Sequence, residues 1–342
     1  MSAIKNSILW LTGSAAMSKP GQKFLKMMNR RGRAEKGDHG HSCLRIFNYH
    51  RVLPGHPRFV IDVIDLQEFE QQVQILTSYF NVCSLESAIP ALQRGELPPD
   101  SVCITFDDGY KDNYEYALPV LAKYGAPATI FLTTDYISNQ KFLWHDLVLW
   151  AFATTETTKL TFDELGLHDA PLLDQDGREK VAVHVLEKLK TVTTTRQDEL
   201  INMLYERMNV TSLPPASYML DWQQIRDMSA MGLRFGAHTK SHAILSKLDD
   251  EALEEEIVGS RKAIELHLPA PVTSFAYPNG RRHDFDERAK KILRESGFQC
   301  AVTTYRGLNY RSQDVFELNR TAAWERNPHR FYGRLLLEQL FD

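Results

Sequence analysis

The chain has 342 residues, 43% of them apolar, and a formal net charge of -4 at pH 7. This length suffices for one large domain with an insertion, and without an excess of cations there is no reason to expect a nucleic acid as a partner. The cysteines lie in or beside apolar runs without C-x-x-C spacing, which predicts small core residues and no disulfide framework. They are Cys43, Cys83, Cys103 and Cys300.

Residues 1–40 form a predicted basic arm. Within residues 1–36, eight Lys and Arg residues accompany the single acid Glu35. Its apolar stretch at 8–11 is far shorter than the roughly 20 residues that span a bilayer. It also makes a poor signal peptide, because polar and basic residues follow it in place of a cleavage site. We therefore expect a cytoplasmic chain, or one peripheral at the inner membrane. A solvated arm and an arm that contacts an anionic membrane surface both fit this pattern.

From residue 44 onward, apolar runs of strand length alternate with stretches of helical spacing. The expected strands lie at 44–49, 82–85, 102–104, 128–132, 233–237, 273–277, 300–303 and 317–320. The expected helices lie at 66–80, 114–124, 222–231, 249–266 and 284–296. This alternation predicts an α/β fold, namely a distorted (β/α) barrel of seven or eight parallel strands.

The segment at about 138–220 interrupts the alternation and is predicted to be a helical insertion. A long amphipathic stretch from Glu179 to Met208 indicates one or two helices. The segment either caps the functional site or packs as a separate unit. The predicted organisation is the arm at 1–40, followed by a single domain at 41–342 that carries this insertion.

The most informative stretch is residues 105–110, where two adjacent acids follow the apolar run at 102–104. Adjacent side chains on an extended backbone point to different sides, so one carboxylate can bind a cation while the other faces a substrate or a water. A solvated Asp-Asp-Gly turn is the alternative interpretation, since Asp and Gly are common turn residues. Asp107 and Asp108 are thus candidates for two separate roles.

His238 and His242 follow another apolar segment, at 233–235. Histidines four apart lie on the same side of a helical turn, and neutral imidazoles are common zinc ligands. Such a pair alone is also typical of an ordinary helix surface. Together with one aspartate it supplies two nitrogens and one oxygen, a ligand set that leaves a coordination position open for a reactive water.

The candidate residues share one position in the predicted barrel. Each follows or ends a predicted strand, at the face where barrel enzymes build their sites. They are His50, Asp107, Asp108, His238, Tyr277 and Arg320.

The motifs T-F-D-D-G at 105–109 and H-T-K-S-H at 238–242 resemble the first two motifs of the NodB-like polysaccharide deacetylases, carbohydrate esterase family four. The resemblance covers roughly residues 44–323. It implies a hydrolase that removes N-acetyl groups from amino sugars of a polysaccharide or glycoconjugate, with a metal-bound water as nucleophile. It also implies that Asp108, His238 and His242 hold the metal, that Asp107 is the general base, and that the Tyr110 backbone amide binds the oxyanion. Two imidazoles and a carboxylate favour Zn²⁺ over magnesium or calcium.

Two places depart from the family pattern. Where the family has an arginine that orients the base, this chain has Ala276, followed by Tyr277, Pro278 and Asn279, which we expect on the substrate side of the site. The histidine of the family's last motif is also missing, because the corresponding strand holds Arg320.

Substitutes for both missing residues are expected elsewhere in the chain. We predict that the Arg320 guanidinium takes over the orienting role, within about 3.2 Å of an Asp107 oxygen. His50 and His329 are the candidates for the general acid. Trp144, in the insertion, is a candidate for stacking on a sugar ring.

Two alternatives remain beside the N-deacetylase. One is a deformylase or deacylase of a lipid-linked amino sugar, for which a basic arm would have a purpose. The other is a catalytically silent glycan-binding protein, against which the intact Asp107 argues, because a binding module needs no general base. The expected partner is a glycan or glycolipid, and the sequence carries no signal that fixes an oligomeric state.

Overall fold

The computed structural model describes residues 43–341, so the predicted basic arm at 1–40 lies outside the described residues. Its main sheet has the strand order β11-β10-β9-β6-β5-β1-β12, with β13 also paired to β1 and β4 to β5. The strands are β1 (Cys43–Tyr49), β4 (Asn81–Val82), β5 (Ser101–Phe106), β6 (Thr129–Leu132), β9 (Arg234–Ala237), β10 (Ser274–Ala276), β11 (Cys300–Val302), β12 (Asn309–Tyr310) and β13 (Thr321–Ala322).

The sheet curves into a barrel that is closed by the segment at 318–322. Val302 at the end of β11 forms a parallel bridge to Leu318, and β13 pairs in parallel with β1. Seven parallel strands, β1, β5, β6, β9, β10, β11 and β13, therefore form the ring. The predicted distorted barrel of seven or eight parallel strands is confirmed.

The strand predicted at 82–85 is wrong in its extent. β4 ends at Val82 and pairs only with the start of β5, outside the ring. The Ser84 side chain accepts a hydrogen bond from the Ser87 amide and begins helix α4 (Leu85–Arg94). The capping serine thus ends the extended segment, whereas the apolar residues alone predict that the strand continues to residue 85.

The helices outside the barrel core are α3 (Leu66–Tyr79), α5 (Leu118–Tyr124), α6 (Thr134–Asn139), α10 (Trp222–Ala230), α11 (Asp250–Glu254), α12 (Ser260–Glu265), α13 (Glu287–Glu295) and α14 (Pro328–Phe341), with π-helical turns η1 (Asn113–Ala117) and η4 (Glu255–Gly259) and the 3-10 turn η3 (Leu245–Lys247). The helix predicted at 249–266 is thus α11 and α12 with η4 between them. Within residues 43–341, no helix is both long and apolar enough to cross a membrane.

The alternation of side chains along the strands separates two cores. Val102, Ile104 and Phe106 of β5 pack outward against the helices, whereas Cys103 points into the barrel. The inner core also holds Leu44 and Ile46 of β1, Phe131 of β6 and apolar residues of α4. Because the side-chain period of a strand is two, the inward face of β5 continues from Cys103 through Thr105 to Asp107 at the rim.

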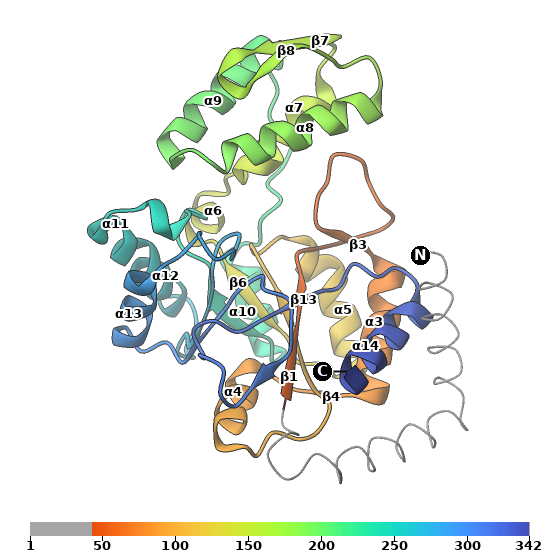
Figure 1. Ribbon diagram of the computed structural model, residues 1–342, viewed down its shortest axis with the longest axis vertical. Coiled ribbons are helices and arrows are strands. Elements are labelled where there is room, and N and C mark those ends of the chain that lie inside the picture. The colour runs from red at the N-terminus through yellow and green to blue at the C-terminus, as the bar shows by residue number, and fades with distance from the viewer. Residues whose placement is uncertain (1–42, 342) are drawn as a thin grey trace.

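Residues 144–210 form a helical subdomain with its own apolar core. It consists of α7 (Trp144–Thr154), β7 (Lys159–Phe162), the 3-10 turn η2 (Asp163–Leu165), β8 (Leu167–Pro171), α8 (Gln175–Leu189) and α9 (Thr194–Arg207). The amphipathic stretch predicted to hold one or two helices matches α8 and α9, while the β7–β8 hairpin was not predicted. Figure 1 shows the subdomain above one end of the barrel.

The loop at 54–62 joins the subdomain to the barrel. It connects β2 (Arg51–Leu53) to β3 (Val63–Asp65), which pair in parallel. Phe59 and Ile61 pack against the apolar core of the subdomain, and Arg58 Nη1 lies 2.8 Å from Asp176 Oδ1 at the start of α8.

Gly236 allows β9 to pack closely inside the barrel. A Cβ atom at this position would lie 2.5 Å from the Phe131 ring and 2.7 Å from Ser274 Oγ. We expect Gly236→Ala to lower the free energy of unfolding by about 1–3 kcal/mol, because the strands must separate to admit the methyl group. Urea denaturation measures this loss, and an unchanged midpoint would contradict the packing described here.

Candidate active site

The carboxyl ends of the ring strands surround a cavity of about 390 Å³. His50 follows β1, Asp107 and Asp108 follow β5, and His238 follows β9. Arg320 lies directly before β13 and lines the same cavity. The structure thus brings together the residues that were predicted from strand ends, at the face where barrel enzymes bind their substrates.

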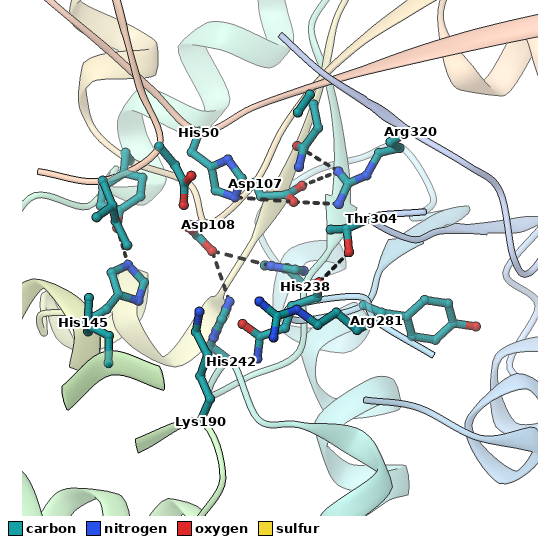
Figure 2. Close-up of a pocket in the computed structure, with 18 of the residues that line it drawn as sticks. His50, Asp107, Asp108, His145, Lys190, His238, His242, Arg281, Thr304 and Arg320 are labelled. Carbon is teal, nitrogen blue, oxygen red and sulfur yellow. Dashed lines mark hydrogen bonds and ion pairs between the residues drawn. The ribbon is translucent and has the colours of Figure 1, made fainter. Parts of the chain in front are cut away.

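Asp107 forms a buried, two-point ion pair with Arg320. Arg320 Nη1 lies 2.8 Å from Asp107 Oδ1 and Nη2 lies 2.7 Å from Oδ2, and both residues are 2% exposed. Arg320 Nε also donates to the Thr303 carbonyl at 2.7 Å, and Nη1 to Asn48 Oδ1 at 3.0 Å. The predicted contact between Arg320 and Asp107 is confirmed (Figure 2).

This pair keeps the Asp107 carboxylate ionised. Burial alone would raise the pKa of Asp107, but the Arg320 guanidinium and the nearby His238 outweigh it, so the pKa lies below its ordinary value. The paired hydrogen bonds also fix the plane of the carboxylate. Asp107 is therefore a charged, oriented carboxylate that faces the cavity.

Asp108 points to the two histidines instead. Its Oδ1 lies 3.5 Å from His238 Nε2 and 3.4 Å from His242 Nε2. The backbone of Asp108 is left-handed, with φ of 72°, and its carbonyl accepts a hydrogen bond of 2.7 Å from Thr133 Oγ1. The two aspartates diverge as predicted, although the cause is this left-handed residue and not an extended backbone.

The three side chains fit a metal ion. One ligand atom from each of Asp108, His238 and His242 lies within 4.8 Å of the others. Asp108 Oδ1 is buried without a hydrogen-bond partner in the described part of the chain. Such an orphaned carboxylate oxygen is costly unless a cation binds it. The donor set can therefore hold a divalent cation.

The pKa values of the two histidines shift in opposite directions. Burial lowers the pKa of His242 to about 3, which leaves the imidazole neutral and able to bind a metal. Burial would also lower the pKa of His238, but the neighbouring carboxylates of Asp108 and Asp107 raise it above its ordinary value. The Nδ1 atom of His238 lies 2.7 Å from the Ala276 carbonyl, so Nε2 is directed toward Asp108.

The prediction that the histidine pair lies on a helical turn is wrong. Residues 238–242 form a loop in which Thr239 and His242 have positive φ values of 64° and 58°. The Glu256 carboxylate, from turn η4, holds this loop: it accepts the Lys240 and Ser241 amides at 2.7 and 2.9 Å and the Ser241 hydroxyl at 2.6 Å. Glu256, which is distant in the sequence, therefore stabilises a loop conformation that the spacing of the two histidines does not predict.

The Tyr110 backbone forms an antiparallel bridge with Met219. The Lys111 amide donates to the Tyr218 carbonyl and the Gly109 carbonyl accepts from the Leu220 amide, so the Tyr110 amide points away from that partner segment. The Tyr110 side chain is buried, and its hydroxyl lies 2.7 Å from His145 Nε2 and 3.2 Å from Asp146 Oδ2.

His50 also lies beside Asp107. Its Nε2 lies 3.8 Å from Asp107 Oδ2, and its side chain is 21% exposed. His329, the second candidate for the general acid, lies on α14 and is not among the described residues that line the cavity. Of the two substitutes that were named from the sequence, the structure places only His50 at the site.

The four predicted substrate-side residues differ in their positions. Asn279 and Trp144 line the cavity. Tyr277 also borders it, but its hydroxyl donates to the Phe316 carbonyl at 2.9 Å and its ring stacks on Phe285 at 3.8 Å, so most of this side chain serves packing. Pro278 is buried and is not among the described lining residues, so its prediction as a substrate contact is wrong.

Several lining residues were missed. Lys190 follows α8, Arg281 and Thr304 follow the ends of β10 and β11, and Trp324 follows β13. Each lies in a loop or at a helix end without a local motif. Only the neighbouring strand ends could have indicated their position.

Three comparisons found known proteins that are similar to this chain. A family model described as polysaccharide deacetylase matches residues 94–301. The poly-beta-1,6-N-acetyl-D-glucosamine N-deacetylase of Staphylococcus epidermidis is 26% identical over 231 residues, which cover 62% of this chain and 78% of that protein.

Two solved structures share the fold. The Streptococcus pyogenes deacetylase PplD in complex with acetate superposes with a TM-score of 0.57 at 19% identity, over 83% of this chain and 93% of that one. IcaB from Ammonifex degensii superposes with a TM-score of 0.55 at 20% identity, over 88% and 97% of the two chains.

The two-point contact between Arg320 and Asp107 generates a prediction. Arg320→Lys keeps the positive charge but loses the planar pair of donors, so we expect turnover to fall about 10- to 100-fold while the bound metal content is retained. Arg282→Ala is the control, because this exposed arginine lies over the Tyr305 ring, away from Asp107. Wild-type turnover in Arg320→Lys would show that Arg320 does not need to orient the Asp107 carboxylate.

Proposed function

We propose that this chain, which belongs to the polysaccharide deacetylase family, uses Asp107 as a general base to hydrolyse the N-acetyl group of an amino sugar in a glycan. The chain is a polysaccharide N-deacetylase, a hydrolase of carbon–nitrogen bonds other than peptide bonds. The observation that carries the proposed mechanism is the separation of the two aspartates. Asp107 is paired with Arg320, whereas Asp108 faces two histidines.

Asp108, His238 and His242 would hold the metal, which we propose to be Zn²⁺, because two neutral imidazoles and one carboxylate are typical zinc ligands. A bound divalent ion would supply Lewis-acid chemistry, which polarises a carbonyl and lowers the pKa of a bound water toward about 7. Three protein ligands would leave a coordination position open.

The remaining steps belong to the protein's own groups. Asp107 takes the proton of the attacking water, and Arg320 holds its carboxylate charged and in plane. The Tyr110 amide donates to the oxygen that gains negative charge. His50, 3.8 Å from Asp107, delivers a proton to the departing nitrogen. The carbon–nitrogen bond then breaks, and the products are acetate and a free amine.

A glycan of the poly-N-acetylglucosamine type is the substrate that we propose. The relative from Staphylococcus epidermidis carries such a polymer in its name. Trp144 and Trp324 give the cavity two aromatic residues, a side-chain type that suits the apolar faces of sugar rings. Release of acetate from β-1,6-linked N-acetylglucosamine oligomers by the zinc-loaded protein tests this proposal, and no release at any oligomer length would overturn it.

The metal ligands are tested without an activity assay. After reconstitution with zinc, we expect His238→Ala combined with His242→Ala to lose nearly all bound metal, because a single carboxylate binds zinc weakly. His184→Ala combined with His283→Ala is the control, since neither residue lies in the described cavity. Elemental analysis measures the metal per chain, and full occupancy in the double site variant would refute the assignment.

The two aspartates should be separable. We expect Asp107→Asn to retain metal but lose acetate release about 100-fold or more, the scale for removal of a general base. Asp108→Ala should lose the metal as well. The measurement is turnover together with metal content. Near-normal turnover in Asp107→Asn would exclude it as the base.

A further inference from the structure

We propose that His145, contributed by the helical subdomain, is a substrate-contacting residue that accepts a hydrogen bond from the acylated sugar. This inference rests on the proposed deacetylase function and extends it to a specificity-determining residue. His145 is 7% exposed and lines the same cavity as Asp107 and Asp108. It is the second residue of α7, which begins at Trp144.

His145 is placed beside the metal-binding residues without belonging to them. Its ring centroid lies 6.0 Å from that of His242, and the two planes are inclined by 70°. Among the described residues, the set whose ligand atoms lie within 4.8 Å of one another contains Asp108, His238 and His242 but not His145. The His145 ring therefore remains available to a molecule bound in the cavity.

The hydrogen bonds of His145 assign its two ring nitrogens. Nε2 lies 2.7 Å from the Tyr110 hydroxyl, which donates its single hydrogen to Asp146 Oδ2 at 3.2 Å. With that hydrogen used, the hydroxyl oxygen accepts from Nε2–H of His145, because a neutral imidazole carries one N–H and one lone pair. The lone pair is then on Nδ1, and a sugar hydroxyl or an acetamide N–H is the matching donor.

A buried network fixes this arrangement. Arg51 Nε donates to Asp112 Oδ2 at 2.8 Å, and the Val52 amide donates to Asp112 Oδ1 at 3.0 Å. The Arg51 guanidinium lies 4.4 Å above the centre of the Tyr110 ring, and its Nη1 is 3.9 Å from Asp146 Oδ1. The network thus ties the start of α7 to the segments that follow β1 and β5.

These contacts hold the His145 ring in one orientation. Tyr110 holds one ring nitrogen, and the Trp144 ring meets the His145 ring edge-on, with centroids 5.4 Å apart. A side chain whose rotamer is fixed by packing and by outer hydrogen bonds makes a selective contact at little cost in entropy. In Figure 2, His145 lies on the opposite side of Asp108 from Arg320. A sugar bound over Asp108 would therefore lie between Asp107 and His145.

Two substitutions separate the nitrogens of His145. The amide of Asn reaches the place of Nδ1, whereas the amide of Gln reaches the place of Nε2. If Nδ1 contacts the sugar, we expect His145→Gln and His145→Ala to lower kcat/KM for N-acetylglucosamine oligomers about 10-fold or more, and His145→Asn to lose clearly less. All three should keep the full metal content, because His145 is not a ligand.

The control is His184→Gln, the same change on α8 of the same subdomain. The His184 Nε2 atom lies 2.9 Å from the Leu165 carbonyl, outside the cavity, and we expect unchanged kinetics. Tyr110→Phe keeps the ring and the backbone amide but removes the hydroxyl that holds His145. Its loss of kcat/KM should therefore lie between the losses of His145→Asn and His145→Ala. A kcat/KM within about twofold of wild type in His145→Ala, or equal losses in Asn and Gln, would overturn the proposal. Loss of metal in His145→Ala would do so too, since it would indicate support of His242 and not of the sugar.

A binding measurement keeps this test independent of turnover. In the Asp107→Asn background, calorimetry of an N-acetylglucosamine oligomer should show weaker binding by about 10-fold when His145→Ala is added. The turnover of Asp107→Asn tests the proposed mechanism, whereas the oligomer affinity of the double variant tests the His145 contact. The two proposals can therefore fail independently, and unchanged affinity in the double variant would refute the contact.

Discussion

The buried ion pair between Asp107 and Arg320 connects the closure of the barrel to its chemistry. Asp107 continues the inward face of β5, and Arg320 continues the inward face of the segment that begins at Leu318. Neither charge is tolerable in this interior alone, since an unpaired buried charge costs roughly 3–5 kcal/mol. The last segment of the ring must therefore meet the first strands in the register that joins the two charges. The same register places the carboxylate at the cavity.

Strain and charge are concentrated on the side of the site that holds Asp108 and the two histidines. Asp108, Thr239 and His242 all have positive φ, a conformation that non-glycine residues adopt at a cost. The Thr133 hydroxyl and the Glu256 carboxylate offset this cost by hydrogen bonds to the two strained loops. The backbone distortion is what turns Asp108 away from Asp107, so the division of labour between the aspartates depends on residues far from both in the sequence.

The sequence predicts those parts of the site that depend on local signals, and it fails where the conformation depends on residues distant in the sequence. Strand ends are local signals, and they suffice to bring Asp107, Asp108 and His238 together. Arg320 was predicted to end a strand at 317–320 but reaches the same site from directly before β13. The conformation at 238–242 and the end of β4 were predicted wrongly, because they depend on Glu256 and on the Ser84 cap. Pro278 was assigned to the substrate side from its position after a strand, yet it is buried. The contact between Tyr110 and His145 spans 35 residues and has no sequence signal of its own.

The network around Tyr110 gives the helical subdomain a direct influence on the reaction centre. Its residues Trp144, His145 and Asp146 reach the barrel at the same tyrosine whose backbone amide lies after the aspartate pair. A shift of α7 would move the Tyr110 ring, and because the ring and the amide belong to one residue next to Gly109, it would also move the amide that we propose as the oxyanion donor. The proposed sugar contact of His145 and this proposed donor therefore meet at Tyr110.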